Sequence, residues 1–421
     1  MYRFVGLIGI AVIFLLCYLM SNNKKAINYK TIGMGFLLQV SLAIFIFKVP
    51  VGQQLFLLIG EFIRKILTFA YEGGSFVFGP LLDNSRLAEL FGSNYSIFAL
   101  QLICSTIFMM VLVNILYYYG IMQRVVAVLG KAMNKVMKVS GAEALSNVAS
   151  AFVGQIVAQI MIKPYLEKLT RSELLASMAG SMACISGAIM PIYIGMGIPA
   201  QYLLASSVMA APGALILAKI IYPETGEPET RDNIRISKRR TFTNVFDGIS
   251  SGASEGMKVA INVIAMILAL VALVAFIDWF LGLAGNFLYN IPYFHNLQFL
   301  SHLSLKLILG KIFAVFALII GVPLPDISTV GALMGTKIVL NEMVAYVDLS
   351  QIANTLDPKS FMLASFALCS FGNFGSIAIQ IGGIGELAPN QRKNLARLSI
   401  RALICGTLSC YMSAAIVGVL I

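Results

Sequence analysis

Phe152 to Leu166 read FVGQIVAQIMIKPYL, and this stretch decides the fold because it is apolar but interrupted. The apolar runs on the two sides of Gly154 are each too short to cross a bilayer, and Lys163-Pro164 closes the second run. The stretch also carries two glutamines, Gln155 and Gln159, where lipid would penalise an amide. It therefore predicts a hairpin that enters the membrane and returns, with Gln155 near its tip.

The composition of the whole chain is that of a membrane protein. Its 421 residues are 59% hydrophobic and only 12% charged, with a mean hydropathy of +0.87, which excludes an ordinary water-soluble globule. Several runs approach the roughly 20 apolar residues that a membrane-spanning helix needs. Because these runs are continuously apolar rather than alternating, they predict an all-α polytopic membrane protein and not a β-barrel.

The net charge of +11 is concentrated in short loops rather than spread over a surface. The basic clusters lie at residues 24–25, 124–138, 231–240 and 392–401. This distribution indicates cytoplasmic loops and argues against nucleic acid as a partner. With an even number of crossings, both termini are then expected outside, and the first apolar segment is expected to be a retained helix because no cleavage site follows it.

Six full-length spans are recognisable, near residues 4–20, 31–48, 96–119, 200–221, 259–283 and 398–421. The segments between them are less regular. Residues 50–82 have an amphipathic pattern that Gly73-Gly74 interrupts, which predicts an interfacial helix followed by a loop.

A second interrupted region, residues 302–385, resembles the first, residues 140–196. Gly and Pro break it from Gly321 to Pro325, where we place the second hairpin's break. A Gly/Ser-interrupted span and a regular helix follow each hairpin, and the charge pattern gives the two units opposite orientations. Such inverted repeats place a transporter's binding site near the membrane midplane. The predicted regions are an N-terminal scaffold with interfacial helices (1–139), a first repeat (140–221), a basic loop with a scaffold helix (222–301) and a second repeat (302–421).

Glu342 is the most informative polar residue, since ionisable groups inside a membrane usually serve an ion path, a ligand or a partner. The alternative is a structural pair with Lys337, although five residues is a poor spacing for a contact along a helix. Asn373 and Ser376 lie three residues apart in FGNFGS. They either bind hydroxyl groups of a ligand or join packed helices.

Patterns typical of enzymes are missing from the sequence. It has no P-loop, HExxH or nucleophile elbow, and its six cysteines form no CxxC pair. We expect no enzyme activity, no metal centre and no cofactor. A channel and a binding or sensory protein remain the alternatives to a transporter.

Five separated motifs resemble, in order, those of the bacterial concentrative nucleoside transporters. They are GQIVAQIMIKPYL, PGALILAKIIYPETGEPET, SEGMKVAINVIAMILALVAL, GVPLPDISTVGALMGTKIVLNEMVAY and FGNFGSIAIQIGGIGELAPNQR. The resemblance runs from about Val51 to the C-terminus. It implies about eight transmembrane helices with two re-entrant hairpins, assembled as a homotrimer in the bacterial inner membrane and importing nucleosides by ion symport with alternating access. It also assigns ribose contacts to Glu342, Asn373 and Ser376.

The nucleobase half of the site departs from the family. The resemblance gives Gln155 a base contact, but Ile156 and Val157 stand where the family has Thr or Ser and then Glu, and Gln159 replaces its proline. Ile189 is placed in the same site. Either Gln159 takes over part of the base contact, or the substrate is a nucleoside with a less polar base, or it is another ribose-like or small solute.

The coupling ion is H+ or Na+, and the resemblance favours H+. The family's sodium site implies Ser150, Val153, Cys184 and Ile185 as the corresponding positions here, with two of the family's side-chain ligands missing. Sodium needs several oxygen ligands. Glu342 is then the group expected to carry the proton, and a non-transporting membrane binding protein is the alternative function.

Overall fold

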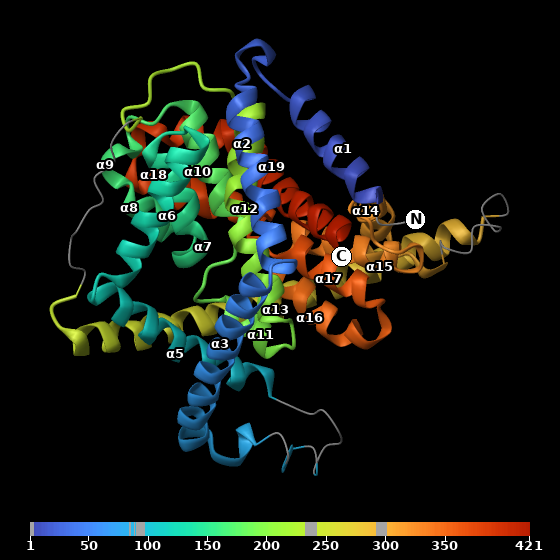
Figure 1. Ribbon diagram of the computed structural model, residues 1–421. Helices are drawn as coiled ribbons and strands as arrows, with labels where there is room; N and C mark the ends of the chain where they lie inside the picture. Colours follow the sequence, from blue (N-terminus) through green and yellow to red (C-terminus); the bar gives the residue numbers. More distant parts are fainter. Residues whose placement is uncertain (1–3, 84–85, 88, 90–96, 232–241, 292–300) are drawn as a thin grey trace.

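The computed structural model describes residues 4–83, 86–87, 89, 97–231, 242–291 and 301–421. All regular elements in these ranges are helices (Figure 1). Most of the basic cluster at 231–240 lies outside the described residues. The helices of the scaffold are α1 (Val5–Leu19), α2 (Tyr29–Phe47), α3 (Pro50–Phe78), α5 (Phe98–Tyr118), α6 (Ile121–Met137), α13 (Val245–Tyr289) and α14 (Leu305–Ile319).

The first repeat contains a helical hairpin, a broken helix and a long helix. The hairpin is α7 (Gly141–Val153) and α8 (Gln155–Met161), followed by the short α9 (Lys163–Leu166); the broken helix is α10 (Arg171–Ala183) and α11 (Met190–Gly195); the long helix is α12 (Ala200–Ile221). Gly154 separates α7 from α8 with φ of +88°, a backbone conformation that glycine adopts without the steric cost of a Cβ. The predicted position of the first hairpin tip is therefore where the structure has it.

The second repeat has the same order of elements. Its hairpin is α15 (Ile327–Val339) and α16 (Glu342–Ile352), its broken helix is α17 (Pro358–Leu368) and α18 (Phe374–Leu387), and its long helix is α19 (Arg392–Leu420). The predicted break at Gly321 to Pro325 was wrong for this hairpin. That segment joins α14 to the hairpin, and the break lies at Leu340-Asn341, where the Asn341 side chain accepts a hydrogen bond from the Val344 amide and so starts α16.

The described helices account for the expected number of spans. Five of them, α2, α5, α12, α13 and α19, are long and apolar enough to cross a membrane, and α1 is a shorter apolar helix. The broken helices α10–α11 and α17–α18 supply two more, so that the described chain agrees with about eight spans. The structure differs from the prediction for residues 50–82, because α3 runs through Gly73-Gly74 without a break. Helix α3 is flanked by α5, and Gly74 lies against the Cys104 side chain, so that packing overrides the weak helix propensity of the pair.

Helices α12 and α19 form the centre of the molecule, and most of their residues are buried. Helix α1 lies along α19, with Gly6 against Ala415, which brings the two ends of the chain into the same part of the molecule (Figure 1). Helices α5 and α13 form a separate pair at the periphery. They approach so closely that a methyl group at Gly252 would lie 2.7 Å from the Cα of Val111.

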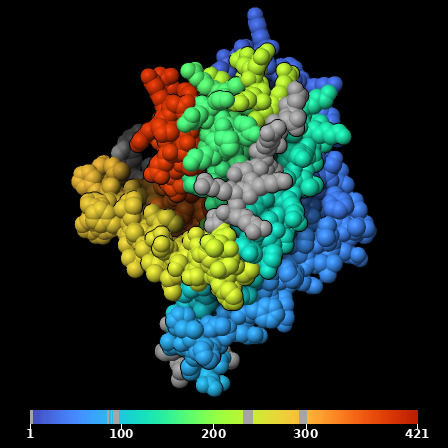
Figure 2. Space-filling model, turned by 90° about the vertical axis from the view of Figure 1, so that its left-hand side faces the viewer, coloured from blue at the N-terminus to red at the C-terminus, as the bar shows by residue number. Residues whose placement is uncertain are grey.

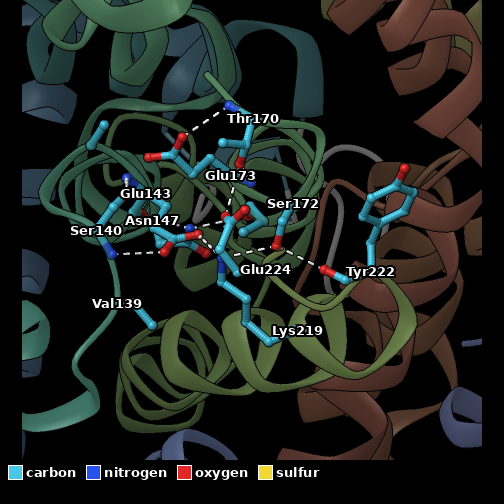
Figure 3. Close-up of polar contacts among 12 residues, drawn as sticks. Val139, Ser140, Glu143, Asn147, Thr170, Ser172, Glu173, Lys219, Tyr222 and Glu224 are labelled. Carbon is cyan, nitrogen blue, oxygen red and sulfur yellow. Dashed lines mark hydrogen bonds and ion pairs between the residues drawn. The ribbon is translucent and has the colours of Figure 1, made fainter. Parts of the chain in front are cut away.

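A buried polar cluster joins α7, α10 and α12 at the end of the first repeat opposite its breaks (Figure 3). The Lys219 ammonium lies 2.8 Å from the Glu143 carboxylate and 3.4 Å from that of Glu224, and it donates to the Ser172 hydroxyl at 2.9 Å. A buried ammonium is tolerated only with such partners. The hairpin and the broken helix are therefore fixed to α12 at their starting ends, which leaves the breaks at their far ends to form the site.

The cluster also contains two matching helix starts. Ser140 and Glu143 exchange hydrogen bonds between side chain and backbone at the start of α7, and Thr170 and Glu173 do the same at the start of α10. Each pair satisfies two amide groups that the first helical turn leaves free.

Removing one of these caps is expected to weaken the first repeat moderately. Ser140→Ala removes the acceptor of the Glu143 amide and should cost about 1 kcal/mol of stability, which lowers the apparent midpoint of thermal unfolding in detergent by a few degrees. Ser140→Thr keeps the hydroxyl and is the matched control. An equal loss in both variants would mean that the hydroxyl does not act as a cap.

Candidate functional site: a cavity between the two repeats

The site is a cavity of about 1740 Å³ that the two repeats share with α5 and α13. Its lining includes residues of both hairpin tips and both broken helices, and on the other side Thr106 to Tyr117 of α5 and Glu255 to Leu270 of α13. In Figure 2 the surface is hollowed between the gold helix α13 and the red C-terminal segment. The cavity therefore lies between a peripheral helix pair and the parts of the repeats where the chain is unwound.

All four chain breaks of the repeats contribute to this cavity. They are Gly154, residues 184–189, Leu340-Asn341 and residues 369–373. The first tip and the first broken helix adjoin, because the Gly187 amide donates to the Phe152 carbonyl at 3.1 Å. Helices α8, α16 and α18 all begin at the cavity, and helix starts present amide donors that suit polar or anionic ligand atoms.

Glu342 is the first residue of α16 and is buried at the cavity wall. One carboxylate oxygen accepts a hydrogen bond from the Tyr193 hydroxyl, and the other accepts one from the Asn373 amide, both at 3.1 Å. The side-chain carbonyl of Asn373 accepts a hydrogen bond from the backbone amide of Ser376 at 2.8 Å and so caps α18. Glu342 and Asn373 therefore hold each other in fixed orientations, and the alternative interpretation, a structural pair of Glu342 with Lys337, is not among these hydrogen bonds.

Gln155 brings the first repeat to the same place. Its side-chain amide donates to the Ser376 hydroxyl at 3.2 Å across the interface of the repeats. Its side-chain carbonyl has no hydrogen-bond partner among the described residues, and the same is true of the Asn341 amide nitrogen. Both residues line the cavity, as do Thr106, Tyr117 and Gln123, whose side chains also have an unpaired polar atom, so the cavity wall contains several polar groups without a partner among the described residues.

The apolar substitutions of the first tip line the cavity as well. Ile156, Val157 and Ile189 are all lining residues, and Ile156 also packs against Gly383 of α18. The structure therefore brings seven of the eight sequence-predicted substrate residues to one cavity, and Gln159 is the one that it places elsewhere.

Gln159 does not lie among the described residues that line the cavity, so its expected contact with the base needs correction. It is fully buried against α10, where its amide donates to the Ser181 hydroxyl and its carbonyl accepts from the Ser177 hydroxyl, both at 2.7 Å. The two glutamines are four residues apart and so lie near the same face of α8, but they have different partners, because Gln155 at the tip bonds Ser376 and Gln159, one turn later, bonds α10. Gln159 therefore fixes α8 to α10.

The four positions predicted for an ion lie close to this tip. The Ser150 hydroxyl donates to the Ser146 carbonyl at 2.7 Å and lies 3.1 Å from the Ser181 hydroxyl. The Cys184 thiol faces the Ser207 carbonyl at 3.5 Å, Ile185 is fully buried, and Val153 lines the cavity. The hydroxyl of Ser150 thus already has protein partners.

Two residues of the site were missed by sequence reasoning. Tyr193 lies in an apolar stretch where a tyrosine is usually a packing residue, and nothing local shows that it donates to Glu342. Glu255 on α13 is another carboxylate of the cavity and accepts a hydrogen bond from the side-chain amide of Asn114 of α5 at 3.3 Å. It lies in the polar start of α13, three residues before Lys258, so its sequence context gave no signal.

Comparisons with known proteins agree with this architecture. Three family profiles match nearly the whole chain: "Na+ dependent nucleoside transporter N-terminus" at residues 8–81, "Nucleoside recognition" at 99–200 and "Na+ dependent nucleoside transporter C-terminus" at 202–418. The chain is 38% identical over 428 residues to an uncharacterized transporter of Haemophilus influenzae, with 99% of this chain and 97% of that protein covered. It is 37% identical over 421 residues to the nucleoside permease NupC of Helicobacter pylori, with the same coverage.

Solved structures give the same result. CNTnw in an inward-facing substrate-bound state has a TM-score of 0.92 to this chain at 37% identity, with 100% of this chain and 98% of that one covered. A doubly substituted variant of CNTnw in an outward-facing state has a TM-score of 0.91 at 37% identity and the same coverage. The matching relatives and structures are transporters rather than enzymes. The chain belongs to the concentrative nucleoside transporter family.

Proposed function

We propose that this protein imports nucleosides across the inner membrane of a bacterial cell by secondary active transport with alternating access. The observation that carries the proposal is the joining of Gln155, Glu342, Asn373 and Ser376 from both repeats at one cavity wall. Sites at the interface of inverted repeats suit a transporter because each repeat can move relative to the rest. Both termini are placed outside and the working unit is a homotrimer in this proposal.

The polar half of the site suits a ribose. A carboxylate and an amide that bond each other, and a hydroxyl that accepts from Gln155, offer acceptors and donors to vicinal hydroxyl groups. The side-chain carbonyl of Gln155, which has no partner among the described residues, would accept a hydrogen bond from a donor group on the base. The side chains of Ile156 and Val157 add only apolar surface, so the base is held with little hydrogen-bond discrimination.

Proton coupling is proposed over sodium coupling. The Ser150 hydroxyl already bonds within the protein, and Cys184 supplies a thiol where an oxygen ligand would suit sodium. Glu342 is the ionisable group of the tip that contacts both repeats' broken helices, through Tyr193 and Asn373. Protonation there would be linked to the contact between the repeats. Sodium coupling through backbone carbonyls near Val153 and Ile185 is the competing arrangement.

Uptake into proteoliposomes tests the proposal. Labelled uridine and adenosine are supplied with an imposed proton gradient, an imposed sodium gradient or neither. Accumulation driven by protons supports the full proposal, whereas accumulation driven by sodium keeps the transport function and overturns the coupling. Binding without accumulation under any gradient would indicate a non-transporting binding protein. Uptake of other small solutes in place of both nucleosides would show that the substrate is not a nucleoside.

Gln155→Ala is expected to weaken nucleoside affinity by about three- to tenfold, the equivalent of one neutral hydrogen bond. The folded assembly should be unchanged, because Gln155 is partly exposed to the cavity and its side chain bonds another cavity residue, Ser376. Equilibrium binding of labelled uridine measures the effect. Gln155→Asn, which keeps the amide on a shorter side chain, is the control, and wild-type affinity in Gln155→Ala would remove Gln155 from the site.

A further inference from the structure

The side of α8 that lines the cavity is apolar and open. Val157 and Ile160 both line the cavity, and they are 40% and 48% exposed. They lie three residues apart and so share a face of the helix, whereas Ala158 and Gln159, on another side of α8, are fully buried. Exposed apolar side chains that gather in a groove mark a place where an apolar group binds.

Helix α13 gives the same cavity a second apolar wall. Its lining residues Val259, Val263, Met266 and Leu270 recur every three or four positions, which places them on one face of the helix. This face extends for about 16 Å along the helix axis, and beyond Glu255 every described residue of α13 that lines the cavity is apolar. We define the apolar groove by six residues from the two helices: Val157, Ile160, Val259, Val263, Met266 and Leu270.

The apolar groove adjoins the polar part of the site. Gln155, whose side-chain carbonyl has no partner among the described residues, is the first residue of α8, and Val157 and Ile160 follow it on the same short helix. The cavity measures about 1740 Å³, whereas pockets for single small ligands measure about 300 to 1,000 Å³. A nucleoside that Glu342 and Asn373 hold by its ribose therefore leaves part of the cavity unfilled.

We propose that the apolar groove binds an apolar substituent of the nucleobase, so that the preferred substrates are ribonucleosides with an alkyl or aryl group on the exocyclic nitrogen of the base. Such a nitrogen keeps one hydrogen to donate to the Gln155 carbonyl, and its substituent then extends along α8 toward Val157 and Ile160. The inference rests on the proposed binding of nucleosides and names their class. Each methylene that passes from water into the groove strengthens binding by about three- to fourfold.

Three ligands test this preference in the purified full-length protein. They are adenosine, N6-butyladenosine and N6-(3-hydroxypropyl)adenosine, and the last has the length of the butyl compound but ends in a hydroxyl group. Competition binding against labelled uridine measures the three affinities. We expect N6-butyladenosine to bind at least about tenfold more tightly than adenosine, with part of the chain buried. The hydroxypropyl compound is expected to lose most of this gain, because its hydroxyl finds no partner in the groove.

A double variant tests whether the two walls cause the preference. Val157→Thr/Val259→Thr replaces one methyl group on each wall by a hydroxyl of similar size. The ratio of the N6-butyladenosine affinity to the adenosine affinity is expected to fall by about tenfold. Val271→Thr is the matched control, because it makes the same change on α13 at a residue that is 52% exposed and is not among the described lining residues. Each single variant replaces the double variant if the latter is not recovered folded.

The possible results separate the groove from the proposed function. Equal affinities for adenosine and N6-butyladenosine would overturn the groove as a substrate site, leave nucleoside binding intact and point to another apolar occupant such as a lipid acyl chain. A preference that is as large in the double variant as in wild type would also overturn it, since partition of the ligand into detergent would then explain the gain. If none of the three nucleosides binds the folded protein, the inference fails together with the proposed function. Binding with the expected preference but without uptake supports the groove and contradicts transport alone.

Discussion

Glu342→Gln is expected to lower nucleoside affinity about a hundredfold, the equivalent of losing two hydrogen bonds to hydroxyl groups. The structure adds a second reason for a large effect. The Asn373 amide donates to one carboxylate oxygen at 3.1 Å, and a glutamine places either a weaker acceptor or a competing donor there. Since the same Asn373 side chain caps α18, the change disturbs the start of that helix together with the site.

Equilibrium binding of labelled uridine to the purified variants measures this effect, with uptake as the second readout. Glu255→Gln is the matched control, because it makes the same chemical change in the same cavity on α13, outside both repeats. We expect Glu255→Gln to change affinity by less than about tenfold, since it alters a contact with Asn114 of the scaffold. Equal losses in the two variants, or wild-type affinity in Glu342→Gln, would contradict a ribose-binding role for Glu342.

The sequence was sufficient for the fold class because membrane helices can be recognised by their length and hydropathy. It was also sufficient for the first hairpin tip, since Gly154 is followed at once by a glutamine in an otherwise apolar run. The structure gives Gly154 a φ that favours glycine, in agreement with this prediction. The second tip was predicted in the wrong place. Gly321 to Pro325 is rich in residues that break helices, but the break at Leu340-Asn341 has no glycine or proline and depends on the Asn341 cap.

A site residue was predictable from the sequence where its chemical type is rare inside a membrane protein. It was not predictable where its role depends on the direction in which the side chain points. A carboxylate such as Glu342 inside a membrane protein needs a function or a partner, so its importance is visible from sequence alone. Gln159 carries the same amide as Gln155, and only the packing of α8 against α10 shows that it bonds Ser177 and Ser181 instead of facing the cavity. Tyr193 illustrates the same limit, since its contact with Glu342 joins residues 149 positions apart.

Restoring polar side chains at the first tip is expected to restore discrimination between bases. In Ile156→Thr/Val157→Glu, the two alkyl groups that line the cavity become a hydroxyl and a carboxylate able to bond the polar edge of a base. Two new hydrogen bonds, one of them charge-assisted, predict that the variant prefers uridine by about a hundredfold over a ribonucleoside whose base is replaced by an apolar ring of similar size.

The wild type is expected to bind these two ligands with affinities that differ by less than about tenfold, because its tip offers one unpaired group, the Gln155 carbonyl, among the described residues. Competition binding against labelled uridine measures both ratios. Val157→Glu and Ile156→Thr alone are the controls, and Ile156→Thr carries a packing cost because Ile156 also contacts Gly383. If wild type already prefers uridine as strongly as the double variant, then other groups read the base, and the alkyl side chains of Ile156 and Val157 are not what sets the selectivity of this transporter.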